Sequence, residues 1–353
     1  MSLLWTRRRG KQSTGHKESV LAKHNIVVIG ASAGGVQAIK KLAAGLPADL
    51  PAAIFIATHL PNFGKSIIPE IIDQAGELPA RHAVNDEPIK LGCIYVASPG
   101  HHLMVEKSHV RVTSGPTENG FRPAIDVLFR SAARTHGRRV IGVVLTGLLD
   151  DGTAGLLAVK RYGGIAIVQD PEDAMHPDMP RSALTYAEPD YCLPLDEIAP
   201  ALVRLVQNDS NPESGGGPSG STGPMDRMEE NLEEMEEGDA PEGPALSACP
   251  ACGGVVLELR DGNMLQFQCR VGHRYSPESL LAQHAENVDT AMWVALRSLE
   301  EHAALSKRMA NHWREMESER IAAGFDKRAA EAERNAELLR KVLSGNASVR
   351  SGY

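Results

Sequence analysis

The chain has 353 residues, of which 42% are hydrophobic, and its formal net charge is -8. This length can bury a sizeable core and predicts two or three domains. The acidic balance gives no reason to expect a nucleic-acid-binding protein, and no apolar run is long enough to span a membrane. Five cysteines are too few for a disulfide framework, so we predict a reducing, cytoplasmic location.

Residues 1–24 are predicted to form a basic flexible tail. Arg7, Arg8 and Arg9 follow a short apolar patch. A secretory signal has the opposite order and a longer apolar region, so this segment does not resemble one.

A G-x-S-x-G motif follows the first predicted strand. Residues 26–29 form an apolar, β-branched run, and Gly30, Ser32 and Gly34 come directly after it. A helix is expected to begin at once, near residue 36. A strand, a sharp glycine-flanked turn and a helix are the setting that exposes a nucleophilic serine. Ser32 is therefore the candidate nucleophile, and the alternative is a serine that only caps the helix.

Residues 25–207 alternate short apolar strands with helical stretches. This pattern predicts an α/β domain with a doubly wound, mainly parallel sheet in a Rossmann-like three-layer arrangement. The further strands that we expect are 52–57, 93–97, 140–145, 164–169 and 191–193, with a hairpin over 103–105 and 110–112. A helix is expected from near Pro123, with Ile125, Leu128, Phe129 and Ala132 on one face.

Three chemically matched side chains follow three of these strands. Ser32, His59 and Asp151 each stand within a few residues of a predicted carboxyl end. In an open parallel sheet these ends share one edge, so we expect the three to meet there. A hydroxyl, an imidazole and a carboxylate are what an acyl-transfer serine requires. The alternatives are a structural histidine, helix-capping aspartates, or Asp150 as the orienting acid.

Several stretches resemble the chemotaxis protein-glutamate methylesterases of the CheB type. They are GASAGG at Gly30, HLP at His59, SPGHHLMV at Ser98, FRPAIDVLF at Phe121, VVLTGLLDDGTAGL at Val143 and MPRSAL at Met179. The resemblance covers residues 25–207 in order. It implies a serine hydrolase that demethylates glutamate γ-methyl esters on chemoreceptors or receptor-like signalling proteins and releases methanol. Some members also deamidate glutamine.

The resemblance also implies roles for single residues. Ser32 would be the nucleophile, His59 the general base and Asp151 the orienting acid. The backbone N–H groups of Ala33 and Leu148 would form the oxyanion hole, and no cofactor would be needed for catalysis. Many members have threonine where this chain has Ala33, and glycine where it has Leu149, so we expect some change in rate or substrate.

The expected partners are a methylated chemoreceptor or receptor-like protein, and a methyltransferase or sensor kinase. The 24 residues before the esterase segment cannot hold a receiver domain, so we expect phosphodonors to have no direct effect. Two alternatives come from other classes: a non-catalytic sensory adaptor that binds a signalling partner, and a small-molecule carboxylesterase.

Residues 208–246 are predicted to be a disordered linker, rich first in Gly, Ser and Pro and then in acidic residues. Residues 247–276 follow as a small metal-binding unit. Cys249, Cys252, Cys269 and His273 have the spacing of a closed Cys3His zinc site. The two short strands between them cannot bury enough apolar surface to fold alone, so we expect a structural zinc; a redox CxxC is the alternative.

Residues 277–345 are predicted to be helical. One apolar stripe comprises Leu281, His284, Val288, Met292, Leu296, Leu299 and Ala303, and Gly324 is expected to divide the segment into two helices. Such a stripe is typical of a core or a coiled-coil seam. We therefore expect dimerisation through these helices, or docking to a receptor or kinase helix bundle.

Overall fold

The computed structural model describes residues 25–59, 66–207, 247–261 and 264–350. Its larger part is built on a seven-stranded sheet in the order β3-β4-β2-β1-β7-β8-β9, in which every neighbouring pair is parallel. The strands are β1 (Ile26–Ala31), β2 (Ala53–Thr58), β3 (Ala80–His82), β4 (Cys93–Val96), β7 (Val140–Val144), β8 (Ile165–Gln169) and β9 (Tyr191–Leu193). A separate ribbon pairs β5 (His102–Val105) with β6 (Val110–Thr113). The predicted mainly parallel α/β sheet is confirmed.

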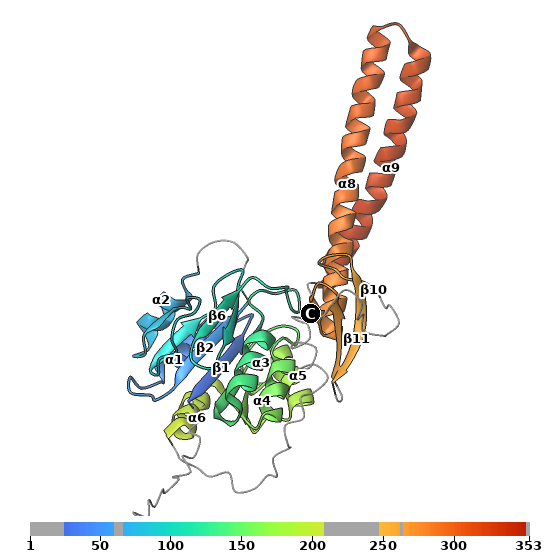
Figure 1. Ribbon diagram of the computed structural model, residues 1–353. Helices are drawn as coiled ribbons and strands as arrows, with labels where there is room; N and C mark the ends of the chain where they lie inside the picture. Colours follow the sequence, from blue (N-terminus) through green and yellow to red (C-terminus); the bar gives the residue numbers. More distant parts are fainter. Residues whose placement is uncertain (1–24, 60–65, 208–246, 262–263, 351–353) are drawn as a thin grey trace, which may run out of the picture.

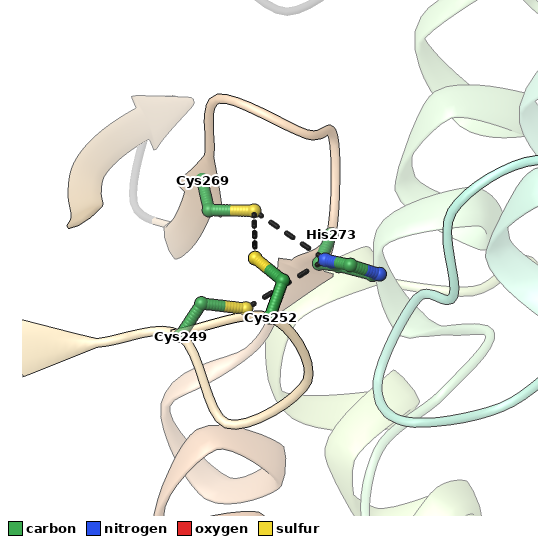
Figure 2. Close-up of side chains that lie close together, drawn as sticks. All are labelled: Cys249, Cys252, Cys269 and His273. Carbon is green, nitrogen blue, oxygen red and sulfur yellow. Dashed lines mark hydrogen bonds between the residues drawn. The ribbon is translucent and has the colours of Figure 1, made fainter. Parts of the chain in front are cut away.

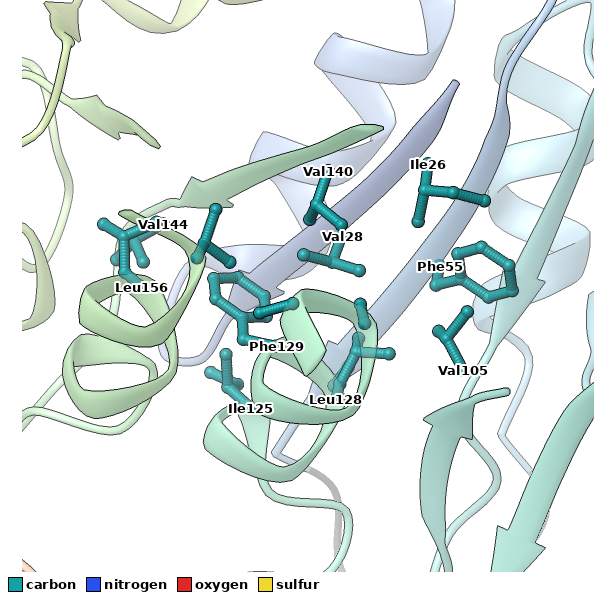
Figure 3. Packing of buried hydrophobic residues seen from close by; sticks show 14 of the residues in the cluster. Ile26, Val28, Phe55, Val105, Ile125, Leu128, Phe129, Val140, Val144 and Leu156 are labelled. Carbon is teal, nitrogen blue, oxygen red and sulfur yellow. The ribbon is translucent and has the colours of Figure 1, made fainter. Parts of the chain in front are cut away.

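Helices cover both faces of this sheet (Figure 1). One face carries α1 (Gly35–Ala44), α2 (Ile68–Ala75) and α6 (Leu195–Gln207), and the other carries α3 (Ile125–His136), α4 (Thr153–Arg161) and α5 (Asp178–Ala187), with a 3-10 turn at Gly137–Arg139. Figure 3 shows the core between the sheet and α3, α4 and α5, in which Phe129 of α3 lies among Val28, Val140 and Leu156. Central strands buried on both faces explain the continuous apolar runs in the sequence.

The register of the central strands brings three loops to one edge. Gly30 of β1 pairs with Ala57 of β2 on one side and with Val144 of β7 on the other. The carboxyl ends of β1, β2 and β7 therefore lie side by side at one edge of the sheet. In a sheet of this kind, the crevice beyond the carboxyl ends of such strands is where functional groups gather.

A smaller module follows. Strands β10 (Ser247–Ala248), β11 (Val255–Asp261), β12 (Met264–Cys269) and β13 (Arg274–Tyr275) form an antiparallel sheet, and α8 (Pro277–Glu315) and α9 (Glu319–Arg350) form a long antiparallel hairpin. Figure 1 shows the hairpin projecting away from the larger domain. Leu296, Ala336 and Leu343 form its core, and an Arg340–Glu300 ion pair flanks it.

Two predictions for these helices are wrong. Gly324 lies inside α9, and the break between the helices falls at residues 316–318, where Glu317 has a positive φ of 56°. A glycine inside a helix costs only about 1 kcal/mol, which packing of α9 along α8 outweighs. The predicted stripe also splits: Met292, Leu296, Leu299 and Ala303 face the seam, whereas Leu281 and Val288 are exposed.

Several further elements were not predicted individually, namely the helices α2, α5 and α6 and the short strands β3, β10 and β13. The predicted tail over 1–24 and the predicted linker over 208–246 lie outside the described residues. The domain boundaries stay predictions. Among the described helices, none combines the length and the hydrophobicity that a membrane span requires.

Candidate active site and metal site

Ser32 lies on a tight turn between β1 and α1. Its N–H donates to the Thr146 carbonyl (3.0 Å), and its own carbonyl accepts from Gly35 (2.8 Å). The residue at the helix N-cap is Gly34, at φ 74°, so Ser32 does not cap α1. Gly147 packs against Ser32 so closely that a Cβ at 147 would lie 2.8 Å from the Ser32 Cβ. The turn therefore holds the Ser32 hydroxyl in one place at the sheet edge.

The three predicted side chains meet at this edge. Ser32 Oγ lies 2.9 Å from His59 Nδ1, and His59 Nε2 lies 2.7 Å from Asp151 Oδ2. The imidazole stacks on the Phe121 ring, with centroids 3.5 Å apart and planes 6° apart. With a carboxylate at Nε2, the neutral imidazole carries its proton there and leaves Nδ1 free to accept from Ser32.

Asp151 is 1% exposed, and polar groups surround it. Its Oδ2 also accepts from the N–H of Ile125 at the start of α3 (2.7 Å), and its Oδ1 accepts from Asn119 Nδ2 (3.1 Å). Burial alone would raise the pKa of Asp151, but hydrogen bonds from His59, Ile125 and Asn119 outweigh it and lower the pKa. The carboxyl is therefore held as an anion.

A second buried carboxyl, Asp126, lies beside this group. Asn119 Nδ2 donates to Asp126 Oδ2 (3.2 Å), and the N–H of Gly155 donates to its Oδ1 (2.6 Å). Burial, and next the charge of Asp151, hold the pKa of Asp126 well above its ordinary value. Sequence reasoning assigned no role to Asn119, which lies two residues before the FRPAIDVLF stretch, or to Asp126, which lies within it. Only the fold shows that both face Asp151.

The side chain of Asp150 points away from His59, toward the start of α8. Its Oδ1 accepts from Ser276 Oγ (2.7 Å) and Ser279 Oγ (3.0 Å), at the start of α8. Asp150 is thus neither the carboxylate beside His59 nor a side-chain cap of α4, the two alternatives left open by the sequence. Burial raises the pKa of Asp150 to about 6.

The predicted oxyanion donors lie on the two turns next to Ser32. Among the described residues, the backbone N–H groups of Ala33 and Leu148 donate to no other protein group. Leu148 is 48% exposed, and Leu149 has a positive φ of 61°. Leu149 thus has a left-handed backbone conformation, which glycine adopts without strain. For a leucine this conformation costs about 1–2 kcal/mol. The roles of both N–H groups stay predictions.

Comparison with known proteins agrees with this geometry. The family model for CheB methylesterase matches residues 27–202. A putative protein-glutamate methylesterase/protein-glutamine glutaminase from Leptospira interrogans is 39% identical over 187 residues, covering 53% of this chain and 97% of the relative. The chain belongs to the CheB methylesterase family.

Two further similarities agree with this assignment to the CheB family. The crystal structure of the Thermotoga maritima CheB methylesterase catalytic domain superposes with a TM-score of 0.50 at 33% identity, covering 52% of this chain and 98% of that domain. A protein-glutamate methylesterase/protein-glutamine glutaminase from Anaeromyxobacter dehalogenans is 38% identical over 186 residues, which are 52% of this chain and 51% of the relative.

A candidate metal site lies in the module that follows the CheB domain (Figure 2). Ligand atoms of Cys249, Cys252, Cys269 and His273 all lie within 4.8 Å of one another. The Cys252 and Cys269 sulfurs are 3.6 Å apart, and Cys269 Sγ lies 3.5 Å from His273 Nδ1. A tetrahedral zinc with ordinary Zn–S and Zn–N bonds separates its ligands by about 3.5–3.8 Å. These residues could therefore hold a metal ion.

The raised pKa of Asp150 predicts a pH dependence of stability. Because the folded state keeps this proton up to a pKa of about 6, and the ordinary value is 3.8, Asp150 lowers stability as the pH rises from about 4 to 6. Asp150→Asn removes that loss. Relative to wild type, the variant should gain about 1 kcal/mol in free energy of unfolding from pH 5 to pH 7.

Urea unfolding at both pH values measures this gain. The same substitution at the exposed Asp49 is the control. A difference between Asp150→Asn and wild type that is equal at pH 5 and pH 7 would contradict the prediction.

Proposed function

We propose that residues 25–207 hydrolyse glutamate γ-methyl esters on a protein substrate, with Ser32, His59 and Asp151 as the catalytic triad. Membership of the CheB methylesterase family and the names of the relatives support this reaction. The observation that carries the proposal is the continuous line of hydrogen bonds from Ser32 Oγ through His59 to Asp151. A cytoplasmic setting is part of the proposal, since none of the five cysteines forms a disulfide.

The first half of the reaction forms an acyl-enzyme. Ser32 Oγ attacks the ester carbonyl while its proton passes to His59 Nδ1, and Asp151 stabilises the resulting imidazolium through Nε2–H. The oxyanion lies against the N–H groups of Ala33 and Leu148, near the positive end of α1. When the tetrahedral intermediate collapses, the methoxy oxygen takes the proton from Nδ1 and leaves as methanol.

The second half restores the enzyme. Water enters where methanol left and gives a proton to His59 Nδ1 while its oxygen attacks the glutamyl ester on Ser32. Collapse returns the proton to Ser32 and releases a free glutamate side chain. A glutamine substrate would form the same acyl-enzyme with ammonia as leaving group, so we include glutamine deamidation in the proposal, in line with the relatives' names.

A methylated chemoreceptor or receptor-like protein is the proposed substrate, and a methyltransferase or sensor kinase a further partner. Dimerisation through α8 and α9 also stays a proposal. The exposed apolar side chains on α8, such as Leu281 and Trp293, are available for such contacts.

We further propose that the metal site holds structural zinc. Four protein ligands fill a tetrahedral shell and leave no open position for substrate, so the ion would stabilise the fold. The sheet of the module packs only a small core, centred on Val256, Phe267 and Tyr275. A core of so few side chains gains from such additional stabilisation.

The triad prediction is tested by methanol release from a methylated receptor signalling fragment. Ser32→Ala and His59→Ala should each lower kcat by about 10⁴-fold or more, because the nucleophile and its base act as a unit. The matched controls are Ser108→Ala and His109→Ala, which change an exposed and a half-buried side chain between β5 and β6. Activity retained by Ser32→Ala would exclude this serine as nucleophile.

The zinc prediction is tested by elemental analysis of protein purified without chelators. We expect about one zinc per chain, and loss of the metal on Cys252→Ser. The control is Cys192→Ser, because Cys192 is exposed and lies outside the cluster. Substoichiometric metal in the wild type would instead favour a redox role for the CxxC pair.

A further inference from the structure

One short segment, residues 117–121, touches the triad on one side and the C-terminal module on the other; we call it the clamp loop. On the triad side, Asn119 Nδ2 donates to Asp151 Oδ1 (3.1 Å), and the Phe121 ring stacks on His59. Two of the three triad residues are thus in direct contact with the clamp loop. Asn119 itself is 4% exposed.

On its other side, the clamp loop joins the sheet of the module. The N–H of Asn119 donates to the Arg274 carbonyl (2.7 Å), and the N–H of Arg274 donates to the Thr117 carbonyl (3.3 Å). These bonds form a parallel bridge between Glu118 and Arg274 in β13. Beside it, the N–H of Ser276 donates to Asn119 Oδ1 (2.9 Å). One amide side chain therefore connects the module to Asp151.

A second contact joins the start of α8 to Asp150, the residue next to Asp151. Ser276 Oγ caps α8 by accepting from the N–H of Ser279 (3.0 Å), and it donates to Asp150 Oδ1 (2.7 Å). Ser276 is 4% exposed. The junction of β13 and α8 thus holds both Asn119 and the segment that carries Asp150 and Asp151.

From these contacts we propose that the C-terminal module is a positioning clamp for the triad, with Ser276 and Asn119 as its positioning residues. The proposal rests on the proposed methylesterase function. The module fixes the Asn119 side chain, and Asn119 in turn fixes the Asp151 carboxylate that orients His59. Docking of the module therefore favours the reactive arrangement, and loosening of this contact lowers turnover.

The backbone of Asn119 explains why the loop needs such a support. Asn119 has a positive φ of 52°. Residues other than glycine adopt this backbone conformation at some cost in free energy. The bonds from Arg274 and Ser276 hold it there. Without them the amide has other conformations available, and Asp151 Oδ1 loses one donor. A displacement of a catalytic group by about 1 Å can cost about 10²-fold in rate.

A substitution at position 276 can remove the hydrogen bond from the Ser276 N–H to Asn119 Oδ1 with little other change to the backbone. Ser276 has φ -73°, which proline shares, and the preceding Tyr275 lies in a strand, as a residue before proline prefers. Ser276→Pro removes both the hydroxyl and the N–H that reaches Asn119. Ser276→Ala removes only the hydroxyl and is the matched control.

The first readout is turnover of a methylated receptor fragment by the full chain. We expect Ser276→Pro to have a kcat about 10–100-fold below that of Ser276→Ala, with KM within about twofold and unchanged metal content. Asn119→Gly, which tolerates the positive φ but lacks the amide, should show the same loss of kcat. Equal kcat values for the Ser276→Pro and Ser276→Ala variants would overturn the proposal.

Amide hydrogen exchange gives a second readout that does not depend on activity. Peptides covering 114–124 and 147–152 should exchange faster in Ser276→Pro than in Ser276→Ala, because the loop and the Asp151 segment lose their support. Equal exchange in both peptides would refute the clamp even if the enzyme is active. A wild type without activity would contradict the proposed function, and the exchange result would still decide on the clamp.

Discussion

The arrangement of the candidate site depends on one buried carboxylate, that of Asp151. Both oxygens are occupied, by His59 and the start of α3 on one side and by Asn119 on the other. A buried anion is tolerated only where such donors compensate for the lost water. These donors come from parts of the chain that are far apart, so the carboxylate can be in place only when the α/β domain has folded around it.

Asp151 and its neighbour Asp150 also link the two folded units. Asp151 contacts His59 at the sheet edge of the CheB domain, whereas Asp150 accepts hydrogen bonds from Ser276 and Ser279 at the start of α8. The side chains of these two consecutive residues point in different directions. One short segment therefore contacts both His59 and the start of α8. The Cys3His cluster lies just before this junction, because its last ligand, His273, precedes Arg274 of β13. A structural metal would thus steady the strand that meets the clamp loop.

Most of the fold could be predicted because the central strands are buried on both faces and show as continuous apolar runs. The edge strand β3, with the sequence Ala-Arg-His, has no such run and was missed. Ser32, His59 and Asp151 stood out because each follows a strand that could be recognised. Asn119 could not be found in this way, since its role comes from a tertiary contact with residues 151 and 276. Gly324 misled the prediction because seam packing outweighs local propensity.

The most direct test of the account is to trap the acyl-enzyme. The wild type is mixed with a methylated receptor fragment, and the reaction is quenched in acid within the first turnover. Peptide mass spectrometry should find the peptide containing Ser32 heavier by the mass of the substrate less methanol. Methanol release with no adduct on Ser32 at any quench time, or an adduct on another residue, would contradict the assignment of Ser32 as nucleophile.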